Sequence, residues 1–207
     1  MPTRTYAITA AAVVIVGLAA TGYAVMRDPG GDPFVDCRRG AVAGGAASIG
    51  GPFALTAADG ARVTDADVIT RPTLVYFGYG FCPDICPTDL SRNALAAEAL
   101  KERGIDVGQV FVSIDPARDT PEAVGDFTAA IDPALVGLTG SDADIAAAAK
   151  AYKVFYRKAG DDPDTYLMDH STFTYLMAPG PGFLEFFGSE VAPEEIADSV
   201  ACFAREL

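Results

Sequence analysis

The chain has 207 residues, a formal net charge of −13, and a hydrophobic content of 50%. This length is enough for one domain with a sizeable core and a short additional segment. The acidic balance excludes a nucleic-acid-binding protein, which needs a basic surface. Solubility explains the acidity best, and a docking surface for a basic partner is the alternative. Because His170 is the single histidine, a zinc site of two cysteines and two histidines is also excluded.

The N-terminal part of the sequence predicts a membrane anchor. Residues 6–26 contain no charged side chain, and as a helix they would span about 30 Å, the thickness of the hydrocarbon core. We therefore expect residues 1–5 to be cytoplasmic and residues 6–26 to form a transmembrane signal anchor. The composition looks bacterial, which predicts an inner-membrane protein whose domain faces the periplasm. The alternative is a cleaved signal peptide, since Ala20 and Gly22 offer a cleavage site.

An irregular region follows the anchor. Residues 27–50 are rich in Gly, Pro and Asp and lack strong periodicity, so we expect a linker or an extended arm. Residues 51–207 have the pattern of a folded domain. It opens with a predicted hairpin over residues 53–63, which turns through an Asp-Gly pair. An apolar, β-rich run over residues 72–78 comes next and predicts a buried strand.

Strands and helices alternate in the rest of the domain. Further strands are predicted over residues 110–114, 136–138, 153–158, 172–177 and 183–187. Helices are predicted over residues 90–103, 121–131, 142–152 and from 193 to the C-terminus. This alternation predicts an α/β fold with a mixed central sheet and helices on both faces. The closing hairpin and helix, with thiols at the first strand–helix junction, predict a thioredoxin-like fold with an added N-terminal hairpin.

Two cysteines lie at that junction, in the stretch YGFCPDICPTDL over residues 79–90. Pro87 fits the first turn of a helix, so Cys82 and Cys86 lie at its start or just before it. The N–H groups and the dipole at a helix N-terminus favour a thiolate. Positions i and i+4 share one face of a helix. The pair is therefore close enough to oxidise to a Cys82–Cys86 disulfide or to bind one soft metal ion.

This stretch resembles the copper-site motif of the Sco/SenC family of membrane-anchored, thioredoxin-like copper proteins. Three further stretches match in order: VSIDPARDTPE over 112–122, VGLTG over 136–140 and YLMDHSTFTYLMAPGPGF over 166–183. The resemblance covers roughly residues 50–206. It implies a copper metallochaperone that delivers copper to the binuclear copper centre of cytochrome c oxidase subunit II, or reduces the cysteines of that centre. Another copper or thiol client, and an upstream copper donor, are further partners that it implies.

His170 is the candidate third ligand. On position alone it would be a packed or solvent-facing residue. It is, however, the only histidine of the chain, it precedes a predicted strand of the sheet, and its Asp-His-Ser sequence matches the position of the copper-ligating histidine in the family. Two thiolates bind Cu(I) linearly, and a nitrogen ligand would complete three-coordination. The resemblance thus implies Cys82, Cys86 and His170 as ligands of Cu(I), with Cu(II) as a further form.

Three aspartates are candidates for roles near this site. Asp169 either orients the imidazole of His170 or is a turn residue. Asp115 ends a predicted strand on the same edge as the thiols, where it acts on the site or is a turn residue. Asp84 lies between the cysteines and either disfavours the thiolates by charge repulsion or is a surface contact.

Cys37 and Cys202 remain outside the motif. Four cysteines in an oxidising compartment divide naturally into one active pair and one structural pair. A Cys37–Cys202 disulfide would attach the arm to the last helix and stabilise the fold by about 5 kcal/mol through loop entropy. The family motif does not include this pair.

The alternative function is a membrane-anchored thiol–disulfide oxidoreductase of the thioredoxin-like class that binds copper incidentally. The Cys-x-x-x-Cys spacing and the presence of His170 count against it. An inert structural disulfide between Cys82 and Cys86 is disfavoured by its position at a helix start. A peroxidase would need an arginine near one activated cysteine, and Arg92 is the only basic residue close by in the sequence. Copper delivery and thiol reduction are compatible, because they use the same pair in different redox states.

Overall fold

The computed structural model describes residues 32–39, 45–162 and 165–207. The chain divides into two compact units, Met1–Asp36 and Cys37–Leu207. The described part of the first unit is a turn in which the carboxylate of Asp32 accepts a hydrogen bond from the backbone N–H of Phe34, at 3.0 Å. The second unit carries the helices and strands discussed below. The domain limits predicted at residues 26 and 50 stay predictions.

The second unit is built on a seven-stranded sheet with the strand order β2-β1-β5-β4-β3-β8-β9. The strands β3, β4 and β5 pair in parallel, and the other neighbours pair antiparallel. This confirms the predicted mixed sheet and places the predicted first hairpin, β1–β2, at one edge. The strands are β1 (Ala54–Ala57), β2 (Arg62–Thr64), β3 (Thr73–Gly78), β4 (Gly108–Ser113), β5 (Leu135–Thr139), β8 (Thr174–Ala178) and β9 (Gly182–Phe187).

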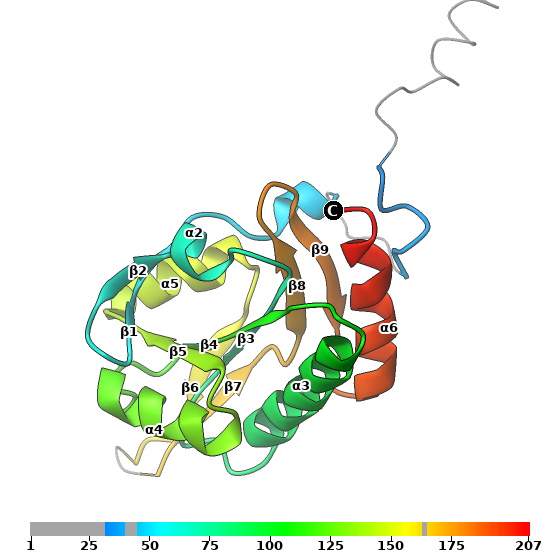
Figure 1. Ribbon diagram of the computed structural model, residues 1–207. Helices are drawn as coiled ribbons and strands as arrows, with labels where there is room; N and C mark the ends of the chain where they lie inside the picture. Colours follow the sequence, from blue (N-terminus) through cyan, green and yellow to red (C-terminus); the bar gives the residue numbers. More distant parts are fainter. Residues whose placement is uncertain (1–31, 40–44, 163–164) are drawn as a thin grey trace, which may run out of the picture. The chain divides into compact units, whose positions relative to one another are not determined.

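Helices cover both faces of this sheet (Figure 1). Because β–α–β connections between parallel strands are right-handed, α3 and α4 lie on the same face, where α6 packs beside α3, and α5 covers the other face. The helices are α3 (Ile85–Glu102), α4 (Pro121–Ile131), α5 (Asp142–Ala151) and α6 (Pro193–Ala204). Thr120 and Ser141 accept hydrogen bonds from the first turns of α4 and α5, as expected of N-caps. The short helices η1 (Ala46–Ser48) and α2 (Asp65–Val68) were not predicted.

The strands β3 and β4 are buried along their whole length, which explains why they read as continuous apolar runs. On one face Phe77 packs against Tyr152, with ring centroids 5.1 Å apart. On the other face Phe111 packs against Phe127, also at 5.1 Å. The strand that leads into the thiol turn therefore lies in the most tightly held part of the sheet.

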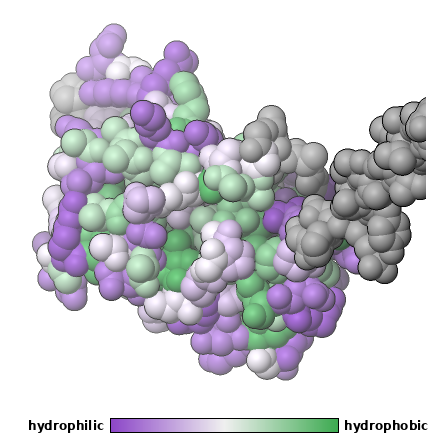
Figure 2. Space-filling view, turned by 90° about the horizontal axis from the view of Figure 1, so that it is seen from above, coloured by the Kyte–Doolittle hydropathy of each residue, from purple (hydrophilic) through white to green (hydrophobic). Residues whose placement is uncertain are grey.

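The face drawn in Figure 2 is mixed, with green hydrophobic areas between purple hydrophilic ones. Hydrophilic and hydrophobic residues alternate there in small patches, the pattern of a solvated surface. Large apolar side chains are nevertheless exposed at single positions, and one of them, Phe81, is 50% exposed directly before Cys82.

A second, two-stranded antiparallel sheet pairs β6 (Tyr156–Ala159) with β7 (Leu167–His170). The sequence predicted a strand from residue 153, but β6 begins later because Lys153 has the left-handed backbone conformation (φ 58°) after α5. The strand β7 was not predicted. As a result His170 is the last residue of a strand in this hairpin, directly before the segment that enters β8.

Cys37 and Cys202 are joined by a disulfide with Cα atoms 5.6 Å apart. The two residues that follow Cys37 make further bonds. The guanidinium of Arg38 donates to the carbonyl of Leu184, and the backbone N–H of Arg39 donates to the carboxylate of Glu185 at 2.9 Å. The segment beginning at Cys37 is thus attached both to α6 and to β9.

The predicted membrane localisation is corrected. Among the described residues, no helix has both the length and the apolar character needed to cross a membrane. The segment for which the anchor was predicted, residues 6–26, lies outside the described part of the chain.

Candidate metal centre

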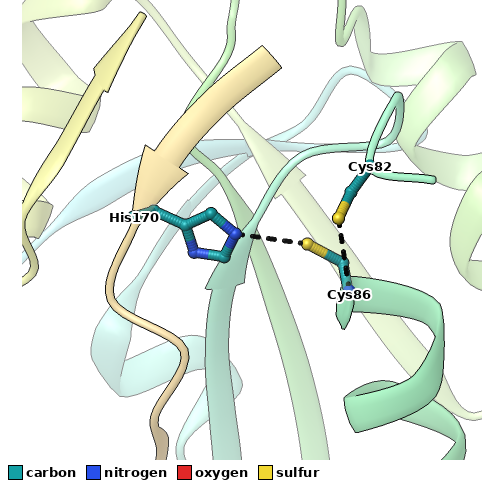
Figure 3. A group of neighbouring side chains, drawn as sticks. All are labelled: Cys82, Cys86 and His170. Atoms are coloured by element: carbon teal, nitrogen blue, oxygen red, sulfur yellow. Dashed lines mark hydrogen bonds between the residues drawn. The ribbon is translucent and has the colours of Figure 1, made fainter. Parts of the chain in front are cut away.

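The two motif cysteines and the single histidine lie together (Figure 3). Cys82 is in the turn between β3 and α3, Cys86 is in the first turn of α3, and His170 ends β7. Their ligand atoms, two Sγ and one imidazole nitrogen, all lie within 4.8 Å of one another. Both thiols are free. The fold therefore brings a residue 84 positions away in sequence onto the thiol pair.

The thiol turn is shaped by its local hydrogen bonds. The backbone N–H of Cys82 donates to the carbonyl of Tyr79 at 3.2 Å, and the N–H of Cys86 donates to the sulfur of Cys82 at 3.3 Å. The Cys82 sulfur thus accepts from an N–H at the helix start, where such groups lack partners within the helix. The carbonyl of Asp84, the N-cap residue, accepts from Thr88 at 3.2 Å. The sequence prediction of thiols at a helix start agrees with this geometry.

The two thiols differ in their acidity. The pKa of Cys82 is lowered to about 3, first by the hydrogen bond from the Cys86 thiol, then by His170 and by the backbone N–H groups of Cys86 and Asp84. The pKa of Cys86 is raised, because this thiol donates to Cys82 and is buried. The pair therefore holds one proton near neutral pH, with a thiolate at Cys82 and a thiol at Cys86. A thiolate is the form that binds metal and attacks disulfides.

His170 presents one defined nitrogen to the sulfurs. Its Nδ1 lies 2.8 Å from the carbonyl oxygen of Ser171, which only accepts, so Nδ1 carries the proton. Nε2 is then the ring nitrogen that faces the sulfurs, 3.5 Å from the Sγ of Cys86. The rings of Tyr76 and Tyr79 contact the imidazole edge-on, with centroids 6.3 Å and 5.8 Å away. A metal-binding histidine is commonly oriented by a hydrogen bond from its second ring nitrogen to a backbone carbonyl.

The three candidate aspartates do not join this group. Asp169 accepts two hydrogen bonds from Arg157, at 3.0 and 2.8 Å. The imidazole of His170 is instead hydrogen-bonded to the carbonyl oxygen of Ser171. Asp84 is exposed, and its backbone N–H favours the Cys82 thiolate that its charge was expected to disfavour.

Asp115, the third candidate, accepts from Arg118 and from the hydroxyl of Tyr166, both at 2.6 Å. Within the described residues, the potential metal ligands that cluster are the two cysteines and His170.

Sequence reasoning missed two groups around the site. Tyr79 belongs to the motif stretch, but no role was assigned to its ring. Arg118 lies in VSIDPARDTPE, and its guanidinium carbon is 4.5 Å from the centroid of the Phe81 ring. Arg92, the basic residue considered for a peroxidase, instead donates to the carbonyl of Gly188 at 2.6 Å and forms an ion pair with Asp89. Arg92 is therefore engaged by Gly188 and Asp89.

A mixed sheet with helices on both faces and two thiols where a central strand meets a helix defines a thioredoxin-like protein, and the nearby imidazole adds to that class a group of side chains with the geometry to hold a metal ion. The SCO1/SenC family model matches residues 41–205 of this chain. The chain therefore belongs to the SCO1/SenC family, which confirms the resemblance found in the sequence.

Individual relatives agree with this assignment. Protein SenC of Rhodobacter capsulatus is 52% identical over an alignment of 207 positions that covers 99% of this chain and 91% of that protein. The crystal structure of Arabidopsis thaliana ScoI with copper bound is 41% identical, with a TM-score of 0.72 over 76% of this chain and 99% of that one. The structure of BsSco, a member of the Sco family of cytochrome c oxidase assembly proteins in which a disulfide switch was identified, is 25% identical, with a TM-score of 0.59 over 74% and 92%.

Proposed function

We propose that this protein is a copper metallochaperone whose cargo is held by Cys82, Cys86 and His170. The observation that carries the proposal is the convergence of two sulfurs and one imidazole nitrogen within 4.8 Å. The copper-bound structure of the Arabidopsis relative supports the choice of metal. The assembly role of the family that includes BsSco supports cytochrome c oxidase as the destination, and the client that we propose there is the copper centre of subunit II.

The ligand set suits Cu(I). Thiolates are soft ligands, and an imidazole nitrogen completes a three-coordinate site. Cys82 is already a thiolate, whereas Cys86 holds a proton that it must release when it binds the metal. Loading with Cu(I) should therefore release about one proton per copper near neutral pH.

Transfer would proceed by ligand exchange. A client cysteine, as its thiolate, binds the metal while His170 or one of the two sulfurs leaves. Cu(I) accepts two or three ligands, so neither step requires a high-energy intermediate, and the copper keeps its oxidation state throughout. His170 suits the role of leaving ligand because its side chain is only half-buried and it ends a short two-stranded sheet. The exposed ring of Phe81 gives a client apolar surface directly beside Cys82.

Thiol reduction is the second candidate function, and the low pKa of Cys82 favours it. In that reaction the Cys82 thiolate attacks a client disulfide and releases one client thiolate. Cys86, once deprotonated, displaces the second client sulfur, so that the client gains two electrons and a Cys82–Cys86 disulfide forms. The disulfide switch described for BsSco supports this redox step.

Anaerobic Cu(I) titration of the reduced full chain tests the metal site. Wild type should bind one tight equivalent, Cys82→Ser should lose it, and His170→Ala should bind more weakly. Arg62→Ala is a matched control, because Arg62 pairs with Asp144 and contributes no ligand. Equal Cu(I) affinity in wild type and His170→Ala would overturn the three-ligand site and favour the reductase.

The client is tested with the isolated copper-centre domain of cytochrome c oxidase subunit II. Cu(I)-loaded protein should pass copper to the reduced domain, and metal-free reduced protein should generate thiols in the oxidised domain only if it is also a reductase. Absence of copper transfer to the reduced domain would exclude this client for copper delivery.

A further inference from the structure

An arginine-centred stack lies between the turn that carries Cys82 and the hairpin that carries His170. The guanidinium carbon of Arg118 is 3.6 Å from the ring centroid of Tyr166 and 4.5 Å from that of Phe81. Tyr166 directly precedes β7, and Phe81 directly precedes the first cysteine. One side chain therefore contacts both the strand segment that leads to the imidazole and the turn that holds the sulfurs.

Hydrogen bonds fix the same arginine to the hairpin. Its Nε donates to the carboxylate of Asp115 at 2.6 Å, and its Nη1 donates to the carbonyl of Tyr166 at 2.9 Å. The hydroxyl of Tyr166 donates to the other oxygen of Asp115 at 2.6 Å. The side chains of Asp115 and Arg118 are 5% and 18% exposed, so solvent and salt screen this ion pair little. Tyr166 is thus held by its ring, its carbonyl and its hydroxyl.

The loop that carries Arg118 also holds the thiol turn. Asp119 accepts a hydrogen bond from the backbone N–H of Gly80 at 2.9 Å and another from the hydroxyl of Ser113. A Cβ at Gly80 would lie 2.9 Å from the Asp119 carboxylate, so a larger residue at this position would displace that carboxylate. The loop between β4 and α4 is therefore fixed to the thiol turn through Asp119 and to the hairpin through Arg118.

We propose that Arg118 is a positioning residue that holds the β6–β7 hairpin against the thiol turn and so keeps the imidazole of His170 within reach of the two sulfurs. A two-stranded hairpin is marginally stable without further packing, and each of these strands has only four residues. Lys158 on β6 also contacts the Tyr166 ring, at 3.9 Å, so Tyr166 connects both strands to Arg118. Without the stack, the hairpin would spend part of its time with His170 away from the sulfurs.

The first test needs no copper. His170 is the only histidine, so its ring protons are identified directly in the NMR spectrum of the reduced, metal-free full chain. Wild type should show nuclear Overhauser contacts from this ring to Tyr76 and Tyr79. Arg118→Ala should lose most of their intensity, and the control Arg62→Ala should keep it. Wild-type contacts in Arg118→Ala would overturn the proposal.

The second test rests on the proposed function and uses Cu(I) alone as the probe. Arg118→Ala should weaken Cu(I) binding roughly tenfold when His170 is present. In the His170→Ala background the same substitution should change the affinity little, because Arg118 acts through the histidine. An equal loss in both backgrounds would overturn the proposal, since it would indicate general destabilisation.

The two tests separate the two hypotheses. A wild-type chain that binds no Cu(I) refutes the metal site, while the ring contacts of His170 still decide the role of Arg118. Should Arg118→Ala fail to fold, Tyr166→Phe carries the same measurements, because it removes only the hydroxyl bond to Asp115. It should reduce the ring contacts and the affinity in the same direction by a smaller factor, and unchanged values would count against the stack.

Discussion

The carboxylate of Asp169 pairs with Arg157 across the β6–β7 hairpin, and the imidazole of the adjacent His170 is held by a backbone carbonyl instead. Consecutive residues of a strand point to opposite sides, so the aspartate and the histidine cannot face the same group within β7. The orientation of the imidazole is therefore a property of the strand end, where the carbonyl of Ser171 follows directly.

Asp169→Asn should accordingly have a small effect. The Asp169 and Arg157 side chains are about half and two-thirds exposed, and such pairs stabilise proteins by about 0–1 kcal/mol. We expect the free energy of unfolding to fall by less than about 1 kcal/mol, and the Cu(I) affinity by less than about threefold. Denaturant unfolding and Cu(I) titration measure both. Arg157→Gln should behave alike, whereas a loss in Asp169→Asn as large as in His170→Ala would show that the carboxylate orients the imidazole after all.

The thiols should differ in their reaction with an alkylating agent. The pKa of Cys82 is lowered to about 3 and that of Cys86 is raised. In reduced protein at about pH 6, iodoacetamide should therefore modify Cys82 first, since only the thiolate reacts. Peptide mass spectrometry after short exposure identifies the modified residue. Preferential reaction at Cys86, or reaction at either thiol only above about pH 8 as in a free cysteine, would contradict the assignment.

The same shifts predict how pH changes the stability of the reduced form. A lowered pKa at Cys82 stabilises the fold above the pKa of an unfolded thiol, about 8.5, and this contribution is lost as the pH falls towards 3. The raised pKa of Cys86 stabilises the fold below the pKa of an unfolded thiol, about 8.5, and this contribution to stability is lost as the pH rises above that value. The stability difference between reduced wild type and Cys82→Ser should therefore grow from pH 5 to pH 8, and a flat difference would refute the charge assignment.

The sequence predicts best those features that depend on neighbours along the chain. The apolar run that became β3 and the thiols at the start of α3 follow from local spacing, because a strand, a turn and a helix each impose their own period. The proximity of Cys82 to Cys86 needs nothing beyond that spacing. For His170 position alone favoured a packed or solvent-facing residue. Its being the only histidine, its place before a predicted strand and the resemblance to a family together indicated a role beside the sulfurs.

Features that depend on long-range packing were not accessible in this way. Arg118 contacts Tyr166, which lies 48 residues away in sequence, and no local sequence pattern predicts such a contact. The strand β7 was not predicted either, and its pairing with β6 decides where Asp169 points. For Asp84 the sequence left charge repulsion and a surface contact open; the side chain is exposed, and the backbone N–H favours the Cys82 thiolate, which no charge pattern predicts.

The disulfide should contribute to stability without affecting the metal site. It closes a separation of 165 residues between Cys37 and Cys202, and removing such a bond typically costs 2–5 kcal/mol. The free energy of unfolding of the double variant Cys37→Ser, Cys202→Ser should therefore be lower by an amount in this range, as measured by denaturant unfolding. Its Cu(I) stoichiometry should stay at one, because neither residue belongs to the ligand group. Loss of the tight equivalent in this variant would instead implicate the pair in metal binding.

Gly78→Ala should damage the metal site through the backbone that supports it. A Cβ at Gly78 would lie 2.8 Å from the sulfur of Cys86 and 2.9 Å from the ring of Tyr76, so the sulfur or the ring must move. Overpacking of this kind typically costs about 1–3 kcal/mol of stability, and the displaced sulfur should also weaken Cu(I) binding.

Gly137→Ala is the matched control for this substitution. Gly137 also lies in a strand of the sheet, and its Cβ would be as crowded, 2.5 Å from the side chain of Val124, but it would not contact a thiol. Both variants should therefore lose stability, whereas only Gly78→Ala should lose Cu(I) affinity in the folded protein. If both lose affinity equally, the effect comes from general loosening of the sheet; if neither does, the Cys86 sulfur tolerates displacement and the site is less rigid than its burial indicates.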